Sequence, residues 1–482
     1  MEEPKQSGES VTERLGSLSR RTAIGALSLA GLGFVLFGPR GASDAPDGRI
    51  VIDYWEKWTG QEGRAMQRIV DEFNALQDRI WVRYFSMSAI EQKALISIAG
   101  DDPPDLIGLQ SFSHPAFLTT DALIPLDKLD EEFGARIAQR MGEYAGEPGF
   151  RLRRELYTGP VWRLMGTGGQ LGGVVSTCSS MAYYYDKDAY REVGLDPERP
   201  PRTIAELDEH ADRLTTRDSD GRLIRAGFVH REPGWWNWLW GYFFGGSVFD
   251  NEANVATAAS PQNVRAYEWV QSYPERIGSS RLVAFQSGFG GYNSTQQPLL
   301  AGKVASAFHG PFLANVIETF QPEFDYGAAP FPVDDAVYDP ARPIALLEGD
   351  TICVPRGAKH PGEAYEFLVF TQLRRNLEAL ARAHAKPSPL AEVSPGFSVG
   401  HPNRAIDMHN TLVASKRAFP KPETPVWPQY EAEFNAEIGT IWDLDAPASE
   451  VLAGIQKRGQ GFIDRHSAYQ RLRQERVAGA ES

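Results

Sequence analysis

Residues 49–55 read RIVIDYW and begin the pattern that decides the fold of this chain. They have the β-branched and aromatic composition of a strand. Apolar side chains at helical spacing follow at 63–76, and the alternation continues as strand, helix and strand patterns at 80–85, 89–99 and 105–109. Strands and helices that alternate at this spacing predict a parallel sheet with crossover helices. The fold class is therefore predicted to be α/β.

The same alternation recurs further along the chain. Helices are predicted at 204–214, which Thr203 opens, and at 264–271 and 361–373, with strands at 181–185, 304–308 and 351–355. These elements predict a second α/β sheet. Two segments lack a clear period. Segment 131–170 is interpreted as an insertion, and the Pro-rich stretch 386–428 is expected to wind over the surface or to link lobes.

Composition narrows the class of protein. A chain of 482 residues with 42% hydrophobic residues can form two or three domains with sizeable cores. Its formal net charge of −14 repels phosphate backbones, so no nucleic-acid partner is expected. Cys178 and Cys353 show no metal-ligand spacing. We expect two small buried residues there, a bridge between them stays open, and neither a metal nor a cofactor is predicted.

The N-terminus has the pattern of an export signal. Ser19-Arg20-Arg21-Thr22 precedes an uncharged, largely apolar run at 23–38, and small residues follow at 41–43. A basic pair before such a run resembles a twin-arginine signal. Residues 1–44 are therefore predicted to be an export signal, with an uncleaved membrane anchor as the alternative. Either way the rest of the chain is expected to be periplasmic or extracytoplasmic.

Five blocks of sequence carry a more specific signal. The first is QKA at 92–94 with AGDDPPDLI at 99–107, and the second is ALIPLD at 122–127. The third joins YYYDKD at 183–188 to GLDP at 194–197 and PPRT at 200–203. The fourth is LAGKVA at 300–305 with HGPF at 309–312, and the fifth is EGD at 348–350 with VPRGAKHP at 354–361.

In this order the five blocks resemble the family 1 extracellular solute-binding proteins, the group that contains maltodextrin-binding and other sugar-binding receptors. The resemblance runs from about residue 50 to about residue 465. It implies a type II periplasmic-binding-protein fold, in which a hinge joins two α/β lobes around a ligand cleft. Residues 45–176 and 352–400 are expected to form the N-terminal lobe, and 177–351 and 401–475 the C-terminal lobe. Two departures from the family pattern, at 171–175 and in the long 131–170 segment, lie near the first lobe crossing.

The resemblance also implies a function. We expect the extracytoplasmic receptor of an ABC importer, a monomer that closes around a mono- or oligosaccharide, passes it to permease subunits and catalyses nothing. One alternative is a receptor for a cationic or glycerol-phosphate-type solute, and another is a lectin-like module without a transporter. An enzyme that acts on glycosides is the remaining rival, since the chain has carboxylates that could pair.

The candidate site follows from the chemistry of sugars, which present apolar faces and a rim of hydroxyls to aromatic rings, carboxylates and amides. Residues 232–240, EPGWWNWLW, place four tryptophans within six positions, and helical spacing would keep them from all facing one core. Carboxyl ends of parallel strands and the family motifs supply the other candidates. The predicted ligand-binding residues are Trp58, Glu62, Gln110, Ser111, Glu232, Trp235, Trp236, Phe312, Glu348, Asp350 and Trp427. Packing of the tryptophans, helix capping by Glu62 and hinge hydrogen bonds of Glu348 and Asp350 are the structural alternatives.

Overall fold

The computed structural model describes residues 45–481, with side chains to Arg476. The chain divides into residues 1–49 and a compact unit that begins at Ile50, and the fold described below is that of the second unit. The predicted export signal at 1–44 lies outside the described residues. No helix among the described residues is long and apolar enough to span a membrane.

Three parallel strands of the first sheet form as the sequence predicts. Strands β1 (Ile50–Glu56), β2 (Ile80–Ser86) and β3 (Leu106–Gln110) are parallel, with β1 between the other two. Helices α2 (Gly60–Leu76) and α3 (Ile90–Ala99) make the two crossovers. Helix α2 buries Met66, Val70 and Phe73 because its apolar residues recur at helical spacing.

A long strand, β14 (Ala345–Cys353), extends this sheet. It pairs antiparallel with β3 and with β6 (Val174–Ser180), and its other end pairs with β15 (Ala418–Phe419). The sheet order is β15-β14-β3-β1-β2, with β6 also on β14. The sequence predicted only the end of β14, at 351–355. Its earlier half contains two acids and a glycine, residues that disfavour a strand until a partner such as β6 pairs with it.

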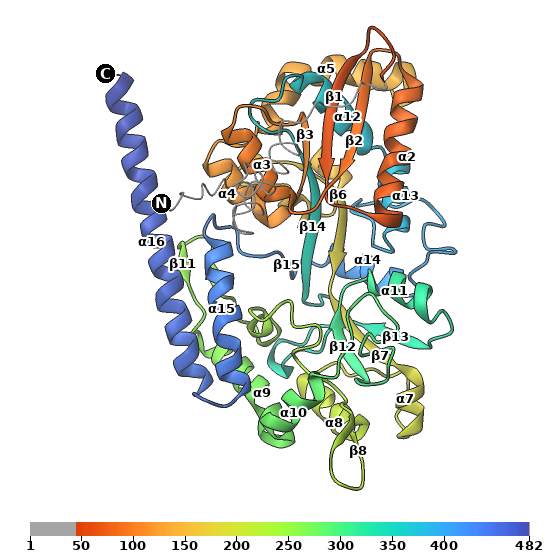
Figure 1. Cartoon of the computed structure of the whole chain (residues 1–482), viewed down its shortest axis with the longest axis vertical. Helices are drawn as coiled ribbons and strands as arrows, with labels where there is room; N and C mark the ends of the chain where they lie inside the picture. The colour runs from red at the N-terminus through yellow and green to blue at the C-terminus, as the bar shows by residue number, and fades with distance from the viewer. Residues whose placement is uncertain (1–44, 482) are drawn as a thin grey trace, which may run out of the picture. The chain divides into compact units, whose positions relative to one another are not determined.

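The second sheet has the order β12-β7-β13, with β12 (Ser306–His309) and β13 (Tyr326–Ala329) antiparallel to β7 (Ala182–Asp186). Strand β7 follows β6 after one residue, Met181, so residues 174–186 connect the two sheets, and β14 runs beside them (Figure 1). Around this sheet lie α7 (Lys187–Glu192), α8 (Ile204–Leu214), α9 (Pro261–Ile277), α10 (Ser279–Gln286) and α11 (Leu313–Phe320). Helix α8 has its predicted bounds, and the Thr203 side chain caps it by accepting a hydrogen bond from Glu206 N.

The predicted insertion at 131–170 is in part a regular helix, so that interpretation needs correction. Helix α5 (Leu126–Tyr144) buries Leu129, Ile137 and Met141 against the first sheet's core. Charged residues along the helix hid this narrow apolar stripe from a search for periodicity. The rest of the segment contains α6 (Gly159–Arg163), β4 (Gly166–Thr167) and β5 (Gln170–Leu171), which pairs antiparallel with β4.

The Pro-rich stretch 386–428 is more buried than a surface connection. It contains α14 (Ile406–Ala414), and Lys386, Asn403 and His409 are all buried. Both cysteines are free and buried, which confirms the expectation of two small buried residues. The remaining short elements are η1 (Ser111–Ser113), α4 (His114–Thr119), η2 (Arg154–Leu156), β8 (Thr216–Arg217), β9 (Leu223–Arg225), η3 (Trp240–Phe244), β10 (Phe249–Asp250), β11 (Val255–Ala256) and η4 (Asp335–Val337).

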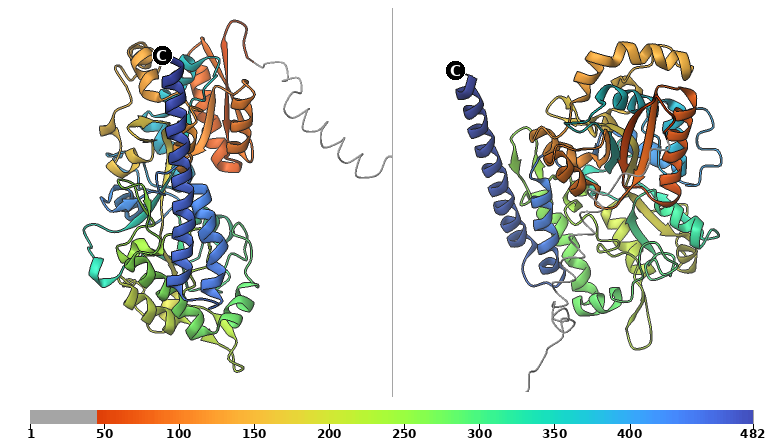
Figure 2. Two further views of the ribbon diagram at one scale, coloured as in Figure 1. Left: turned by 90° about the vertical axis from the view of Figure 1, so that its left-hand side faces the viewer. Right: turned by 45° about the horizontal axis from the view of Figure 1, so that its top comes forward.

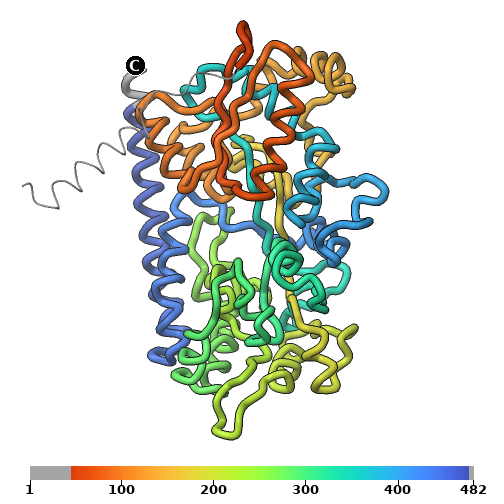
Figure 3. The backbone as a smooth tube through the Cα atoms, turned by 45° about the vertical axis from the view of Figure 1, so that its right-hand side comes forward, coloured from red at the N-terminus to blue at the C-terminus, as the bar shows by residue number. Residues whose placement is uncertain are grey.

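Four helices complete the fold: α12 (Pro361–Thr371), α13 (Arg374–Ala383), α15 (Trp427–Trp442) and α16 (Ala448–Glu481). Helix α16 begins against α15 and α9 and runs along the body of the unit (Figures 2 and 3). Near its far end the Arg473 side chain donates a hydrogen bond to Thr119 O at 2.9 Å and pairs with Asp121. This last helix therefore touches elements next to both sheets.

Candidate functional site

A cavity of about 790 Å³, measured out to its open mouth, lies where β3 ends and β14 passes toward the second sheet. Strand β3 delivers its residues to this place because it ends at Gln110, and residues at the carboxyl ends of parallel strands face such crevices. The structure brings six of the eleven predicted residues together here. The lining is Gln110, Phe112, Ser179, Trp235, Trp236, Phe312, Glu348, Gly349, Asp350, Lys386 and Lys421.

One wall of the cavity is aromatic. The Trp235 side chain is 44% exposed, and its ring lies 6.3 Å from that of Phe312 with 29° between their planes. Tyr292 packs edge-on against Trp235 at 5.2 Å and donates a hydrogen bond to Phe312 O. A flat apolar surface of this kind, partly open to solvent, suits the face of a ring-shaped ligand.

The other tryptophans of the cluster turn inward. Trp236, Trp238 and Trp240 are buried in one core, and only Trp235 is exposed. Helical spacing does not spread them, because residues 234–239 form turns and the 3₁₀ helix η3 begins only at Trp240. The four tryptophans do not all face one core, as expected, but only Trp235 lies outside it. The cause is the non-helical path of the chain around Trp235 and not helical spacing.

The floor of the cavity is a buried charge cluster centred on Asp350. Its Oδ2 accepts hydrogen bonds from Lys386 Nζ at 2.8 Å and Thr177 Oγ1 at 2.7 Å, and Lys57 Nζ lies 3.0 Å from its Oδ1. Lys57 also lies 3.3 Å from Glu56. Burial favours the neutral acid, but the two ammonium groups outweigh it and hold the pKa of Asp350 far below its usual range. Asp350 is therefore ionised, and the ammonium groups of Lys57 and Lys386 already compensate its charge.

A second polar group sits beside the aromatic wall. Trp236 Nε1 donates a hydrogen bond to Glu348 Oε1 at 3.2 Å, and Lys421 Nζ lies 3.8 Å from the same oxygen. Lys421 is also 3.1 Å from Glu431 and 3.9 Å from the ring centroid of Phe112. Burial raises the pKa of Glu348, while Lys421 and the Trp236 hydrogen bond oppose the rise.

Trp58 and Glu62 lie beside the cavity and outside its lining. Trp58 is buried and packs edge-on against His384, with ring centroids 4.6 Å apart. Glu62, in the first turn of α2, has its Oε1 3.6 Å from His384 Nδ1. Burial raises the pKa of Glu62, and the nearby Lys386 ammonium opposes this.

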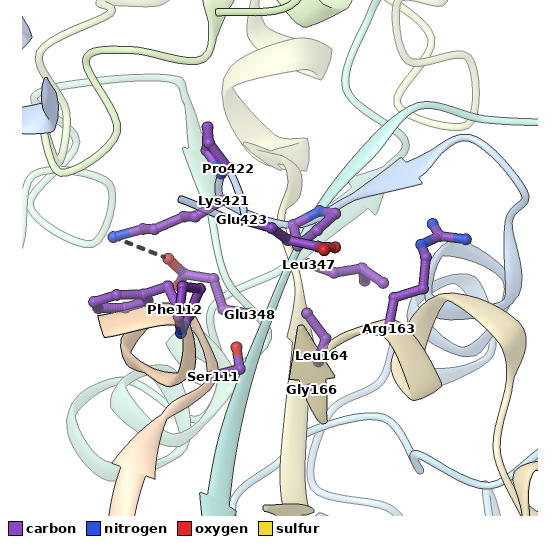
Figure 4. A pocket seen from close by; sticks show the side chains of 12 residues that line it. Ser111, Phe112, Arg163, Leu164, Gly166, Leu347, Glu348, Lys421, Pro422 and Glu423 are labelled. Carbon is purple, nitrogen blue, oxygen red and sulfur yellow. Dashed lines mark ion pairs between the residues drawn. The ribbon is translucent and has the colours of Figure 1, made fainter. Parts of the chain in front are cut away.

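The other three predicted residues lie elsewhere. Ser111 lines a smaller neighbouring pocket of about 340 Å³ (Figure 4). Glu232 is buried, accepts a hydrogen bond from Gln297 at 3.3 Å, and burial raises its pKa to about 7. Trp427 is fully buried, with its ring 5.0 Å from that of Trp238. None of the three is part of the lining of the central cavity.

Sequence reasoning missed five residues of the lining and one of the charge cluster below it. These are Phe112, Ser179, Gly349, Lys386 and Lys421 in the lining, and Lys57 in the cluster. Phe112 directly follows the predicted Ser111, so the strand-end argument could have found it. Lys386 and Lys421 lie in the Pro-rich stretch, and only their distant partners Asp350 and Glu348 reveal them. Among residues 45–481 there is no group of His, Cys, Asp and Glu side chains arranged to hold a metal.

Comparisons with known proteins agree with this architecture. Residues 156–372 match the family of bacterial extracellular solute-binding proteins. The sn-glycerol-3-phosphate-binding periplasmic protein UgpB of Pectobacterium atrosepticum is 20% identical over 474 residues, which are 92% of this chain and 96% of that protein. UgpB of Escherichia coli strain K12 is 20% identical over 437 residues, covering 86% of this chain and 92% of its own.

Solved structures share the fold. CpMnBP1 with mannotriose bound has a TM-score of 0.68 at 22% identity, covering 85% of this chain and all of its own. The cyclic α-maltosyl-1,6-maltose binding protein from Arthrobacter globiformis has a TM-score of 0.69 at 17% identity, with coverages of 87% and 100%. UgpB from Mycobacterium tuberculosis in complex with glycerophosphocholine has a TM-score of 0.64 at 19% identity, with coverages of 87% and 100%.

These matches define the class of fold: the chain has the two-lobed, type II fold of solute-binding proteins, and its residues 156–372 match the model of the bacterial extracellular solute-binding family. The predicted resemblance and fold class are confirmed. The predicted lobe boundaries and the roles of individual site residues stay predictions.

Proposed function

We propose that this chain is the extracytoplasmic receptor of an ABC importer and that it binds a carbohydrate in the central cavity. One observation carries the choice of ligand. The cavity combines the exposed Trp235 ring with charged groups that neutralise one another, since its lining holds two lysines and two carboxylates. A neutral ligand rich in hydroxyls matches an aromatic face next to compensated hydrogen-bonding groups.

Binding would proceed by closure of the lobes. Gln110 and Phe112 come from the end of β3, whereas Trp235 and Phe312 come from segments around the second sheet. The two groups are joined through residues 174–186 and β14. A ligand that contacts both groups only in the closed form shifts the open–closed equilibrium toward that form. We retain 45–176 with 352–400, and 177–351 with 401–475, as the proposed lobes.

The structure gives a physical argument against catalysis. Glycoside hydrolysis needs one free carboxylate and one protonated acid, and Asp350 and Glu348 share the cavity. Asp350, however, has both oxygens engaged, by Lys57, Lys386 and Thr177. It would have to break three contacts to act as a nucleophile or base, so we propose a receptor that releases its ligand unchanged.

Export and assembly complete the proposal. The twin-arginine-like segment at 1–44 would direct the chain out of the cytoplasm, to the periplasm or an equivalent extracytoplasmic compartment. The receptor would work there as a monomer that delivers its sugar to permease subunits. Relatives that match 86% to 92% of this chain are named as periplasmic binding proteins, which supports an extracytoplasmic location for this chain.

A glycerol-phosphate-type solute is the second candidate. The named function of the UgpB relatives and the two lysines in the lining favour it. Against it, Lys386 is already paired with Asp350, and Lys421 with Glu431. A phosphate would have to compete with these carboxylates for the same ammonium groups.

Titration calorimetry of the purified full chain tests the proposal. The panel is maltose, mannobiose, longer members of both series, glycerol 3-phosphate, glycerophosphocholine and two polyamines. Saturable micromolar binding of a saccharide that is recovered intact supports the carbohydrate receptor. Binding of the phosphate esters alone moves the ligand to the second candidate, and new products in the recovered saccharide contradict the receptor proposal.

A further inference from the structure

A separate cavity of about 640 Å³, measured out to its open mouth, lies beside the end of strand β13. Its walls come from residues 200–202, from the segment 329–344 that leads from β13 to β14, and from Arg417, which directly precedes β15. Among the described residues, this lining and that of the central cavity have no member in common. A volume of this size lies within the range of pockets that hold small molecules.

The inner walls of this cavity are apolar. Phe331, Val333 and Ile344 are buried and line it, together with prolines from both segments. The proline ring fixes one backbone angle, so walls of this kind lose little freedom when a ligand binds. The two segments are also tied to each other, since Val333 N donates a hydrogen bond to Arg202 O at 3.2 Å and Ile204 N donates one to Val333 O at 2.9 Å. An apolar group would therefore meet a preformed surface.

The charged residues of this lining are mostly basic, although the chain has a net charge of −14. Arg202, Arg342 and Arg417 line the cavity with one carboxylate, Asp339. Two of the arginines are already paired, because Arg202 Nη2 lies 2.8 Å from Glu206 and Arg342 Nε lies 2.8 Å from Asp339. No carboxylate of the described residues forms an ion pair with Arg417, so its positive charge has no counter-ion in the cavity.

The guanidinium of Arg417 is held in place with part of its donors free. Its Nη1 donates hydrogen bonds to Val337 O at 2.8 Å and to Arg342 O at 3.3 Å. Within the described part of the chain, its Nε and Nη2 make no hydrogen bond. These two nitrogens form a fork of parallel N–H groups that matches the two oxygens of one carboxylate. The free side of Arg417 therefore favours a carboxylate over a neutral hydroxyl.

We propose that this cavity, which we call the Arg417 cavity, is a second ligand site and that it binds a small organic carboxylate with an apolar ring or chain. The carboxylate pairs with Nε and Nη2 of Arg417, and the apolar body lies on Phe331, Val333 and Ile344. The site goes beyond the proposed sugar binding and does not depend on it, because the two cavities are lined by different residues.

A saturation-transfer NMR titration of the full chain with cinnamate and with cinnamyl alcohol tests the proposal. The two probes share one apolar body and differ in the carboxylate, so the difference between their affinities measures the contact with Arg417. For the wild type, cinnamate is expected to bind about tenfold more tightly than the alcohol, because a charged pair of hydrogen bonds replaces a neutral one.

Four substitutions show where cinnamate binds. Arg417→Gln removes the charge and the fork, and it should weaken cinnamate about tenfold while the alcohol keeps its affinity. Tyr338→Asp, at a lining position that is 40% exposed, should weaken cinnamate by repulsion and leaves the backbone contacts of Arg417 in place. Arg222→Gln removes an exposed arginine outside the cavity and is the matched control. Trp235→Ala, on the wall of the central cavity, should also leave cinnamate binding unchanged.

The results that would overturn the proposal are distinct. If cinnamate fails to bind the wild type or binds no more tightly than the alcohol, or if Arg417→Gln and Arg222→Gln act equally, the Arg417 cavity is not a carboxylate site. If Trp235→Ala abolishes cinnamate binding, the anion binds in the central cavity instead. If sedimentation shows a wild-type dimer that Tyr338→Asp dissociates, the cavity is an interface between two copies of the chain. The saccharide panel tests the proposed function separately from all of these.

Discussion

The carboxylate of Asp350 lies 2.8 Å from the ammonium nitrogen of Lys386, and this contact ties strand β14 to the segment that follows α13. Both side chains are largely buried, and a second ammonium group, on Lys57, approaches the other oxygen. Neutralising the carboxylate would leave the buried Lys386 ammonium without its carboxylate partner and Lys57 with Glu56 alone. An uncompensated buried charge costs far more than the loss of one exposed ion pair.

Asp350→Asn is therefore expected to lower the free energy of unfolding at pH 7 by about 3 to 5 kcal/mol. Asp188→Asn, which breaks the exposed pair with Arg191, is the control and should leave the urea midpoint close to wild type. Urea unfolding followed by circular dichroism measures both. Equal effects of the two substitutions would show that the cluster at Asp350 is not the buried, mutually dependent group described above.

The Asp350 cluster also predicts that the free energy of unfolding falls at acid pH. The folded-state pKa of Asp350 lies far below its unfolded value, so its stabilising contribution is present above the unfolded pKa of about 4 and is lost as the pH falls below it. In Asp350→Asn this part of the acid destabilisation should be missing. Urea midpoints measured between pH 6 and pH 3 would reveal it as a shallower decline than in the wild type.

The pH dependence of stability expected from Glu232 has the opposite sign to that expected from Asp350. Burial raises its pKa from 4.5 to about 7, so the protonated acid is favoured in the folded state. Its contribution to stability is fully present below pH 4.5 and is lost as the pH rises through 7. Glu232→Gln keeps an oxygen for the Gln297 hydrogen bond and should be more stable than wild type at pH 8, by about 3 kcal/mol at most. Urea midpoints at pH 4.5, 6 and 8 test this, and an unchanged pH slope would contradict it.

Trp235 and Trp427 should respond differently to the same substitution. Trp235 is 44% exposed on the wall of the cavity, whereas Trp427 is fully buried. Trp235→Ala is expected to weaken ligand binding about tenfold or more with little change in thermal midpoint. Trp427→Ala should lower the free energy of unfolding by about 3 to 5 kcal/mol, because it leaves a large cavity in the core. Calorimetry and thermal unfolding of both variants test the pair, and loss of binding by a stably folded Trp427→Ala would restore that residue to the site.

Local sequence patterns were sufficient to predict the three parallel strands of the first sheet, β1, β2 and β3. The RIVIDYW strand, the α2 periodicity and the Thr203 cap each depend on neighbours in the chain, and each is present in the structure. Charge clusters in α5 concealed its apolar stripe, and only pairing with β6 reveals the full length of β14.

Parts of the candidate site depended on contacts that no local pattern contains. Strand ends and family motifs placed Gln110, Phe312, Glu348 and Asp350 around one cavity. Lys386 is 36 positions from Asp350, and no sequence pattern near either residue predicts their contact. Likewise, the sequence could not distinguish Trp235 from Trp427, because exposure is decided by the segments that pack on each ring and not by the residues beside it.

The contacts of helix α16 would change with movement of the lobes. The helix packs on α15 and α9, yet Arg473 contacts Thr119, the last residue of the short helix α4, and Asp121 just beyond it. Any rotation of the first sheet's lobe about β14 must slide or release this distant contact. A pair of spin labels on α16 and beside Asp121 would therefore read lobe movement directly, far from the ligand, as a change in one distance.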